Sequence, residues 1–154
     1  MATGLRRAFE AEYDLAFAAE QVFPLLCPVR EYDWIEGWQC ELVQSVSGLV
    51  ERDCVFVTAF PGLGREVWHT TRHEPSRLVE FVRVGAHCSL RYSIELRPAG
   101  AGTRMTVRQA WVALDSEGEK LVRALPPNQV QLHWDFLSRA LAHYLATGNM
   151  LALA

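Results

Sequence analysis

The chain has 154 residues, of which 50% are hydrophobic and 21% charged, and its formal net charge is −3 at pH 7. This length and composition suit one globular domain spanning residues 1–154. The charge argues against nucleic acid as a partner, and no apolar run approaches the roughly 20 residues that a membrane-spanning helix needs. The first residues lack the apolar core of a signal peptide, which predicts a cytoplasmic protein without membrane insertion.

The four cysteines are widely scattered, and no two of them form a CxxC pair. That spacing is poor material for either a zinc site or a disulfide framework. We therefore expect reduced thiols at Cys27, Cys40, Cys54 and Cys88.

The chain begins with a pattern that is typical of a half-buried strand. Over residues 8–17, "AFEAEYDLAF", apolar or aromatic side chains alternate with acidic ones. Residues 19–36 lose this alternation and predict two short helices, which break near Pro28 and end at Gly37. From about residue 38 to residue 114, short apolar runs separated by turn segments such as "SVSG", "FPGLG" and "RPAGAG" predict six strands.

Two further helices are expected after the strands. Residues 115–125, "DSEGEKLVRAL", predict a short helix. Asn128 and Gln131 form a capping box that predicts the start of a long helix to Thr147, with Gly148 as its C-terminal stop. This helix carries an apolar stripe at helical spacing, made of Val130, Trp134, Leu137, Leu141, Tyr144 and Leu145.

The order of elements predicts an α+β fold. Short connections between the strands favour an antiparallel meander, against whose concave face the long helix buries its stripe. The segments "VFPLLCPVREYDWIEGW", "GTRMTVRQAWVAL" and "WDFLSRALAHYL" lie at the short helices, the last strand and the closing helix.

In this order and wording the chain resembles the START/SRPBCC superfamily, which includes the birch-pollen allergen and polyketide cyclase relatives. The resemblance spans nearly the whole chain. It implies a helix-grip fold, in which a seven-stranded curved antiparallel sheet, two short helices and a long C-terminal helix enclose a cavity. One departure is that "SVSGLVER" stands where plant relatives carry a glycine-rich loop, which argues against ligands of the plant-allergen type.

If the hairpins are tight, the residues that face inward on one strand determine which residues face inward on the next strand. In "CSLRYSIEL", Leu90 and Tyr92 face inward, opposite Phe81 and Val79, and Arg91 lies opposite Glu80 outside. The next hairpin gives the pairs Phe81–Thr70, Val79–Arg72 and Trp68–Arg83. The last strand turns Met105, Val107, Gln109 and Trp111 inward.

The same register places His69 and His73, in "HTTRHEP", on the outer face. Residues four apart on a strand are about 13 Å from each other. Metal–nitrogen bonds near 2 Å require ligands that converge. We therefore expect no metal site at these histidines.

The outer strands show a conflict. The "FPGLGR" hairpin gives the pairs Val57–Trp68, Val55–Thr70 and Asp53–Arg72, and the "SG" turn gives Leu42–Asp53 and Cys40–Val55. Cys54, Phe56 and Phe60 then face outward. Either a bulge shifts that strand, or a second chain, as in a homodimer, covers the patch.

The interior offers a few polar groups among apolar ones, and each has a structural and a functional interpretation. Arg72 with Asp53 suggests a buried ion pair, and Arg83 a cation–π contact with Trp68. Tyr92 and Gln109 can satisfy each other. Alternatively, these groups serve a pocket, whose predicted ligand-binding residues are Trp68, Thr70, Arg72, Arg83, Tyr92, Gln109, Trp111, His133, Trp134 and Leu137.

We predict a protein that binds a small hydrophobic or aromatic, possibly acidic, molecule between the sheet and the C-terminal helix, with Arg83 as the anchor for an acid. The alternative that the resemblance implies is an enzyme of the polyketide cyclase or dehydratase type, using the same pocket. A third is a partner-binding module with a filled interior. GxSxG, P-loop and GxGxxG motifs are absent, so no cofactor is expected. Catalytic residues stay unknown.

Overall fold

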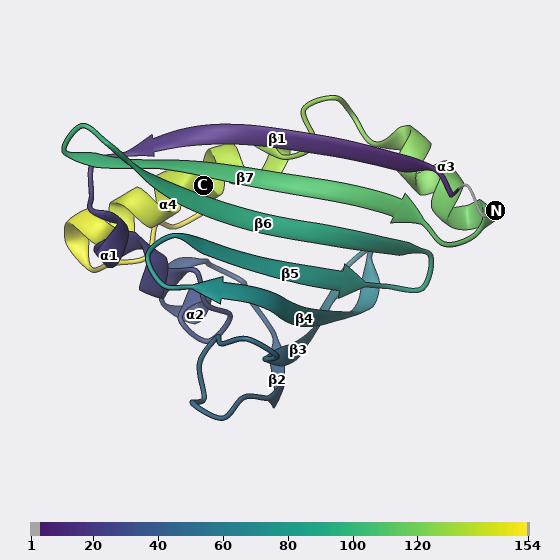
Figure 1. Cartoon of the computed structure of the whole chain (residues 1–154), viewed down its shortest axis with the longest axis horizontal. Coiled ribbons are helices and arrows are strands. Elements are labelled where there is room, and N and C mark those ends of the chain that lie inside the picture. The colour runs from purple at the N-terminus through teal and green to yellow at the C-terminus, as the bar shows by residue number, and fades with distance from the viewer. Residues whose placement is uncertain (1–3, 154) are drawn as a thin grey trace.

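The computed structural model describes residues 4–153, and its centre is one curved antiparallel sheet (Figure 1). The seven strands lie in the order β1-β7-β6-β5-β4-β3-β2, and every neighbouring pair is antiparallel. The strands are β1 (Arg6–Leu15), β2 (Glu41–Gln44), β3 (Val55–Phe60), β4 (Gly64–Glu74), β5 (Leu78–Val84), β6 (Cys88–Ala99) and β7 (Gly102–Ala113).

In the view of Figure 1 the helices lie in two places, most of them behind the left part of the sheet and one at its right end near the N-terminus. Between β1 and β2 the chain forms α1 (Ala19–Val22), the 3₁₀ helix η1 (Phe23–Leu25) and α2 (Glu31–Trp34). After β7 come α3 (Ser116–Ala124) and α4 (Gln131–Thr147). The expected helix-grip α+β architecture is confirmed. Over residues 4–153, no helix combines the length and apolarity that crossing a membrane requires.

Helix α4 closes the concave face with the expected stripe. Val130, Trp134 and Leu141 are buried, and Gly148 ends the helix in the left-handed conformation at φ 72°. The capping box is wrong, because Val130 is the N-cap and no side chain caps it. The backbone carbonyl of Asn128 instead accepts from the N–H of Leu132 at 3.2 Å.

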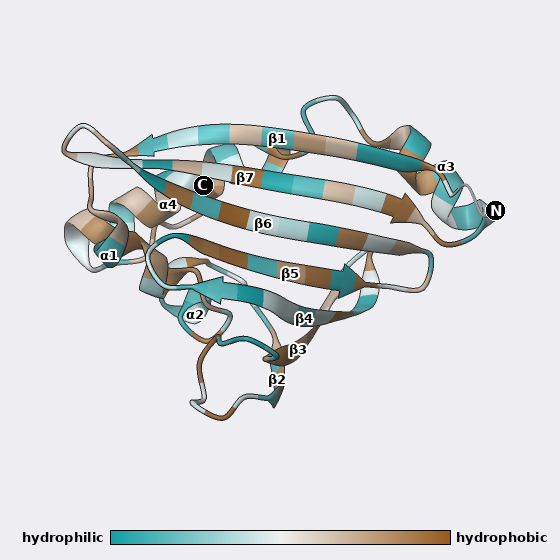
Figure 2. Ribbon diagram, in the orientation of Figure 1, coloured by the Kyte–Doolittle hydropathy of each residue, from teal (hydrophilic) through white to brown (hydrophobic). Residues whose placement is uncertain are grey.

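Alternating hydropathy along β1 and β5–β7 separates the two faces of the sheet (Figure 2). Leu90, Ile94, Leu96, Met105 and Val107 are buried on the concave side, as the parity argument predicted. A second, smaller core lies beneath α3 and contains Leu90, Trp111, Ala113 and Val122. All four cysteines are free thiols.

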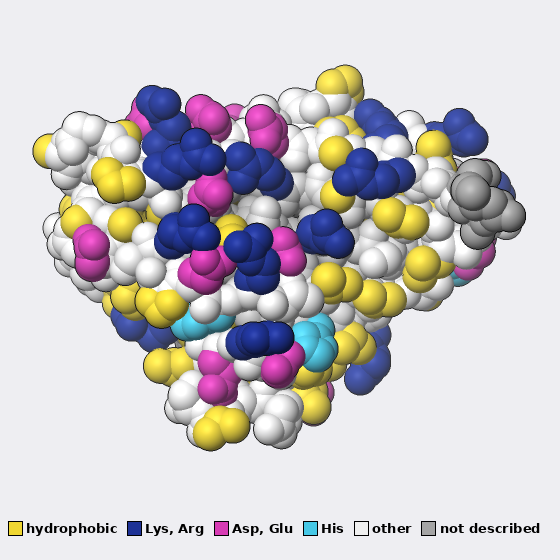
Figure 3. Space-filling model, viewed as in Figure 1, with side chains coloured by type: hydrophobic (Ala, Val, Ile, Leu, Met, Phe, Trp, Pro, Cys, Tyr) yellow, Lys and Arg dark blue, Asp and Glu magenta, His cyan; other side chains and the backbone are white. Residues whose placement is uncertain are grey.

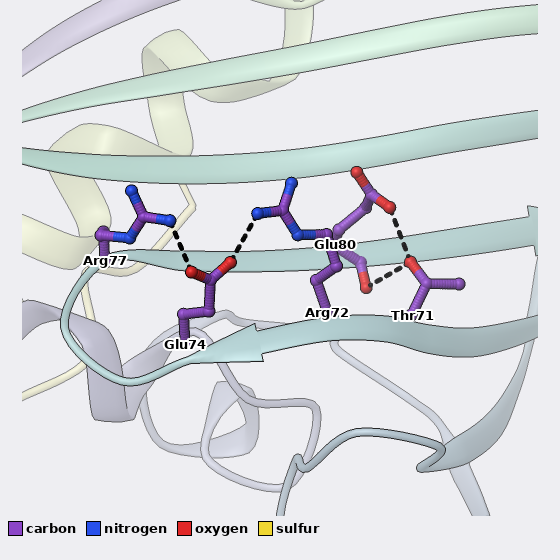
Figure 4. A network of polar contacts seen from close by, with 5 residues as sticks. All are labelled: Thr71, Arg72, Glu74, Arg77 and Glu80. Atoms are coloured by element: carbon purple, nitrogen blue, oxygen red, sulfur yellow. Dashed lines mark hydrogen bonds and ion pairs between the residues drawn. The ribbon is translucent and has the colours of Figure 1, made fainter.

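The face away from α4 carries interspersed Arg and acidic side chains (Figure 3). In the network of Figure 4, Glu74 accepts from Arg72 at 2.7 Å and from Arg77. Thr71 donates to the Glu80 carboxylate at 2.8 Å. This network satisfies the outward side chains around an irregularity in β4.

That irregularity corrects part of the expected register. Thr70 lies opposite Phe81, and Trp68 opposite Arg83, as predicted, but a bulge at Thr71 places Arg72 opposite Glu80. Arg72 therefore points outward.

For the same reason His73 lies on the inner side, where its ring is 5.4 Å from that of Phe23. His69 stays outside, 3.0 Å from the Asp53 carboxylate. The predictions of an inward Arg72 and an outward His73 are wrong.

The outer strands differ from expectation by one residue. Phe56, rather than Val57, lies opposite Trp68, because the connection at 61–63 is three residues long and Gly62 and Gly64 adopt positive φ. Cys54 and Phe56 are consequently buried. The predicted Asp53–Arg72 pair does not form, since both side chains are exposed and have other partners.

The remaining corrections are smaller. Phe60 packs on Trp38 with ring centroids 5.5 Å apart, so the outward patch of Phe56 and Phe60 that suggested a second chain is absent. In β2, Leu42 lies opposite Phe56. Between β5 and β6 the register is offset by two residues, which preserves the parity but places Tyr92 opposite Phe81 and Arg91 opposite Val82.

Candidate ligand-binding site

A cavity of about 70 Å³ lies between the concave face, α2 and α4. Its volume exceeds the roughly 10–15 Å³ that a single water needs, and it falls below the roughly 300 Å³ of a drug-sized site. Side chains of α2 and its flanks, the sheet and α4 line it: Pro28, Glu31, Trp34, Ile35, Trp38, Phe56, Trp68, Phe81, Tyr92, Ile94, Trp134 and Leu137.

The sheet side of the cavity is an aromatic cluster centred on Trp68. The Trp68 ring stacks on Phe56 at 5.0 Å and meets the edge of Phe81 at 5.6 Å. Its Nε1 donates to the Thr58 hydroxyl at 2.9 Å. Because the indole is held by both packing and a hydrogen bond, this wall is fixed before any ligand arrives.

The helix side is joined to the sheet through Tyr92. The Trp134 Nε1 of α4 donates to the Tyr92 hydroxyl oxygen. Burial raises the pKa of Tyr92 to about 12, so the phenol keeps its proton at physiological pH. The side chains of Trp134 and Gln109 both lower this pKa by hydrogen bonding to Tyr92, as the predicted Tyr92–Gln109 contact requires. Because the phenol oxygen accepts from Trp134, its hydroxyl hydrogen is still able to donate.

The segment around α2 supplies the third wall. Trp34 Nε1 donates to the Leu25 carbonyl at 2.9 Å, and Trp38 Nε1 donates to the Pro28 carbonyl at 2.8 Å. These two bonds fix a single helical turn whose own backbone could not stabilise it. They also orient Glu31, which precedes Trp34 by three residues, toward the cavity.

Glu31 is the only formally ionisable carboxyl among the lining residues. No hydrogen bond or ion pair joins its carboxyl to any side chain of residues 4–153. Burial raises the pKa of Glu31 to about 8. The loss of hydration favours the neutral acid form of Glu31, although this side chain is only partly buried.

Arg83, the expected anchor for an acidic ligand, has a different environment. Its guanidinium lies 4.4 Å from the Trp68 ring centroid, which confirms the cation–π contact. It also pairs with Glu66 at 2.7 Å, and both side chains are about nine-tenths buried. Arg83 does not line the cavity, and Glu66 offsets its charge.

The sequence-predicted site residues separate into three groups. Trp68, Tyr92, Trp134 and Leu137 line the cavity. Thr70, Arg83 and Gln109 are buried on the concave face outside the lining, and Gln109 accepts from Trp111 Nε1 at 3.1 Å. The remaining three lie elsewhere: Arg72 and His133 are exposed, and Trp111 belongs to the core under α3. For His133 the reason is its position beside, rather than within, the buried stripe of α4.

Sequence reasoning missed Glu31, Trp34, Ile35 and Trp38. A signal was present, because these residues follow the spacing i, i+3, i+4, i+7 of one helical face. It also missed Glu66, the partner of Arg83, although Glu66 shares the inward parity of Trp68.

Two other places are weaker candidates. A wider hollow of about 570 Å³ on the convex face is open and is formed by Val67, Val82 and their neighbours, with no buried polar group to orient a ligand. Within residues 4–153, no three His, Cys, Asp or Glu side chains cluster as metal ligands would. His69 and His73 in particular lie on opposite faces of β4.

No protein-family model matches the sequence, and no curated protein matches it. Solved structures do resemble it. Mll3558 from Rhizobium loti is 19% identical, with 92% of this chain and 99% of that chain covered at a TM-score of 0.66. Norcoclaurine synthase from Thalictrum flavum, a point mutant in complex with a transition-state analogue, is 13% identical, with coverages of 96% and 99% and a TM-score of 0.73. CalU16 from Micromonospora echinospora is 14% identical, with coverages of 96% and 88% and a TM-score of 0.59.

Norcoclaurine synthase and CalU16 are members of the START/SRPBCC superfamily. The chain therefore has the helix-grip fold of that superfamily, as its element order suggested. At these identities the likeness concerns the fold, so the argument for function rests on the cavity itself.

Proposed function

We propose that the chain binds a small apolar molecule, or the apolar end of a larger one, in the cavity between the sheet, α2 and α4. The observation that carries this proposal is the lining, which is aromatic and aliphatic except for Glu31 and the Tyr92 hydroxyl. An apolar site with a few convergent polar groups is the usual form of a small-molecule site.

The size of the cavity limits the ligand. About 70 Å³ accommodates a small group, and burial contributes about 25 cal/mol per Å² of apolar surface removed from water. A larger ligand would have to displace a movable part of the wall. Leu137 is such a part, because it is only partly buried and no polar contact holds it.

The proposed ligand contacts are Trp68, Tyr92, Trp134 and Leu137, together with Glu31. Thr70, Arg83 and Gln109 would support the wall from behind. An acidic ligand is disfavoured, since Glu66 compensates Arg83 and the ionisable groups of the lining are a carboxylic acid and a phenol.

A second candidate function is an acid–base enzyme on the same site. It is favoured by Glu31, whose pKa burial raises to about 8. General acid–base catalysis is most effective when the pKa of the group lies near the working pH. Glu31 would then give a proton to, or accept one from, a bound carbonyl compound.

Methylenecyclohexane is an uncharged hydrocarbon larger than the cavity of about 70 Å³, so its binding requires Leu137 to move. NMR titration of the tryptophan indole signals can measure this binding. Leu137→Trp should fill the cavity and weaken binding at least about tenfold, since the ligand loses its space. The matched control is Leu132→Trp on the same helix, where the side chain is 56% exposed; it should bind like the wild type. Equal binding by both variants, or no binding by the wild type, would contradict the proposal.

A further inference from the structure

We infer that the ligand of this cavity is a neutral molecule with a hydrogen-bond-accepting oxygen, such as a ketone or aldehyde, and that Glu31 and Tyr92 donate to that oxygen. The inference rests on the proposed binding function and adds the chemical class of the ligand. It differs from the expectation of an acidic ligand, because the polar groups in the lining are hydrogen donors.

Glu31 has no charged partner in its surroundings. The residue lines the cavity together with Trp34, Trp38 and Trp134, and no cation in residues 4–153 forms an ion pair with it. The buried cation Arg83 is already paired with Glu66 at 2.7 Å. Another charged group of the region, Arg30, pairs with Asp33 at 2.9 Å.

The protonation of Glu31 depends on its burial. Loss of hydration is the cause that raises the pKa of Glu31 to about 8. The titratable groups packed around it are Cys40, whose pKa burial raises above its usual value, and Tyr92, whose pKa is about 12. Glu31 is therefore the group of the cavity whose charge changes between pH 6 and pH 9.

Glu31 and Tyr92 are the two hydrogen-bond donors that we propose for the ligand. A protonated Glu31 offers one O–H, and Tyr92, whose oxygen accepts from Trp134, offers another. A carbonyl oxygen has two lone pairs and can accept both bonds. A hydrocarbon would leave the donors unsatisfied in an apolar site, which costs free energy, and an anion would find no uncompensated positive charge.

A cationic ligand is the sharpest alternative, because aromatic walls and a carboxylate attract ammonium groups. The two classes differ in the sign of their pH dependence. A cation requires ionised Glu31, so its affinity would rise with pH, whereas a carbonyl ligand needs the proton and its affinity would fall above pH 8.

Cyclohexanone and methylenecyclohexane form the test pair, since they share a ring and differ by an oxygen in place of a methylene group. Glu31→Met removes the donor at similar length and should weaken cyclohexanone about fivefold, while methylenecyclohexane changes less than about twofold. Glu31→Gln retains a donor, and cyclohexanone should bind within about twofold of the wild type. The comparison of each ligand across variants removes the difference in their hydration.

The pH arm uses the wild type and Glu31→Gln at pH 6.5 and pH 9. Cyclohexanone should bind the wild type several-fold more weakly at pH 9, and Glu31→Gln equally at both values. Cyclohexylammonium serves as the cationic probe and should bind more weakly than cyclohexanone at pH 6.5.

The outcomes separate this inference from the proposed function. If Glu31→Met weakens both uncharged ligands equally, or if cyclohexylammonium binds best and tightens with pH, the carbonyl assignment is overturned while the cavity remains a binding site. If neither cyclohexanone nor methylenecyclohexane binds the wild type, the binding function itself fails and the inference fails with it.

Discussion

Two glutamates on the concave side of the sheet lie in contrasting environments. Glu66, on β4, is held 2.7 Å from Arg83, which stacks on Trp68. Glu31, on the single turn of α2, lies across the same aromatic cluster without a charged partner. Glu66 therefore lies at a charge-compensated end of the interior, although Arg83 Nε has no hydrogen-bond partner, and Glu31 lies at an uncompensated end. Glu31 is only partly buried, and a carboxyl group in an apolar cavity without an ion-pair partner is a candidate for a role outside folding.

The difference has a structural origin. Trp68 lies directly opposite Arg83, which makes Glu66 a diagonal neighbour of Arg83. Diagonal neighbours on adjacent strands are about 7–8 Å apart, so the long side chains of Glu66 on β4 and Arg83 on β5 reach each other. α2 faces the sheet across a cavity and has no such neighbour. The following substitutions test whether the two ends behave as differently as this geometry requires.

The largest effect is expected at the compensated end. Glu66→Leu would leave the Arg83 guanidinium buried without its partner and should lower the free energy of unfolding by about 3–5 kcal/mol. Urea denaturation measures this loss. The double variant with Arg83→Met should recover most of it, because the pair is then replaced by apolar groups; a double variant as unstable as Glu66→Leu would contradict the pairing.

At the uncompensated end, replacing the glutamate should stabilise the protein instead of destabilising it. The pKa of Glu31 in the folded state, about 8, lies above the usual value of 4.5, so the folded protein binds this proton more tightly. Between about pH 4.5 and pH 8 this carboxyl is ionised in the unfolded chain and protonated in the folded protein, so stability is lost as the pH rises over this range. Glu31→Gln should become more stable relative to the wild type by roughly 2 kcal/mol between pH 5 and pH 8, after allowance for partial exposure. A pH-independent difference would show that the carboxyl is hydrated.

A moderate loss of stability is expected for a substitution at Tyr92. Tyr92→Phe removes the acceptor of the buried Trp134 Nε1 donor and should cost roughly 1–2 kcal/mol of unfolding free energy. Thermal denaturation monitored by tryptophan fluorescence can measure it. If Tyr92→Phe causes no loss of stability, water rather than Tyr92 accepts the hydrogen bond from the Trp134 indole.

The smallest effects belong to the two histidines of β4. His69 pairs with Asp53 at the surface, and His69→Ala should change stability by less than about 0.5 kcal/mol. His73 packs on Phe23, so His73→Ala should cost more, about 1 kcal/mol. Equal costs for the two variants would argue against the bulge that turns them to opposite faces.

The sequence predicted the regular strands of the sheet well and the irregular ones poorly. Alternation along β6 and β7 placed Leu90, Met105, Val107 and Gln109 on the concave face, since each strand carries its own period of two. The predicted orientation of the β3 side chains was inverted. A change of one residue in the length of the loop at 61–63 turns every side chain of β3 to the opposite face of the sheet. The bulge at Thr71 likewise places Arg72 and His73 on the faces opposite to those predicted. The sequence around Thr71 contains no glycine that would have indicated a bulge.

The candidate site was less predictable than the sheet. Trp68, Tyr92, Trp134 and Leu137 were found because they lie on long periodic elements. Glu31 was missed because α2 is one turn long, and its orientation depends on tertiary bonds from Trp34 and Trp38. Such tertiary hydrogen bonds cannot be predicted from the periodicity of the local sequence.

The most direct test of the account is the titration of the Glu31 carboxyl carbon by NMR, in protein labelled with ¹³C at the glutamate side chains. The Glu31→Gln variant assigns the signal by its loss. We expect this signal to titrate near pH 8, because the carboxyl lies in an apolar cavity without a charged partner. A Glu31 signal that titrates near pH 4.5 would contradict both the neutral acid and the contrast with Glu66 on which the proposed ligand chemistry depends.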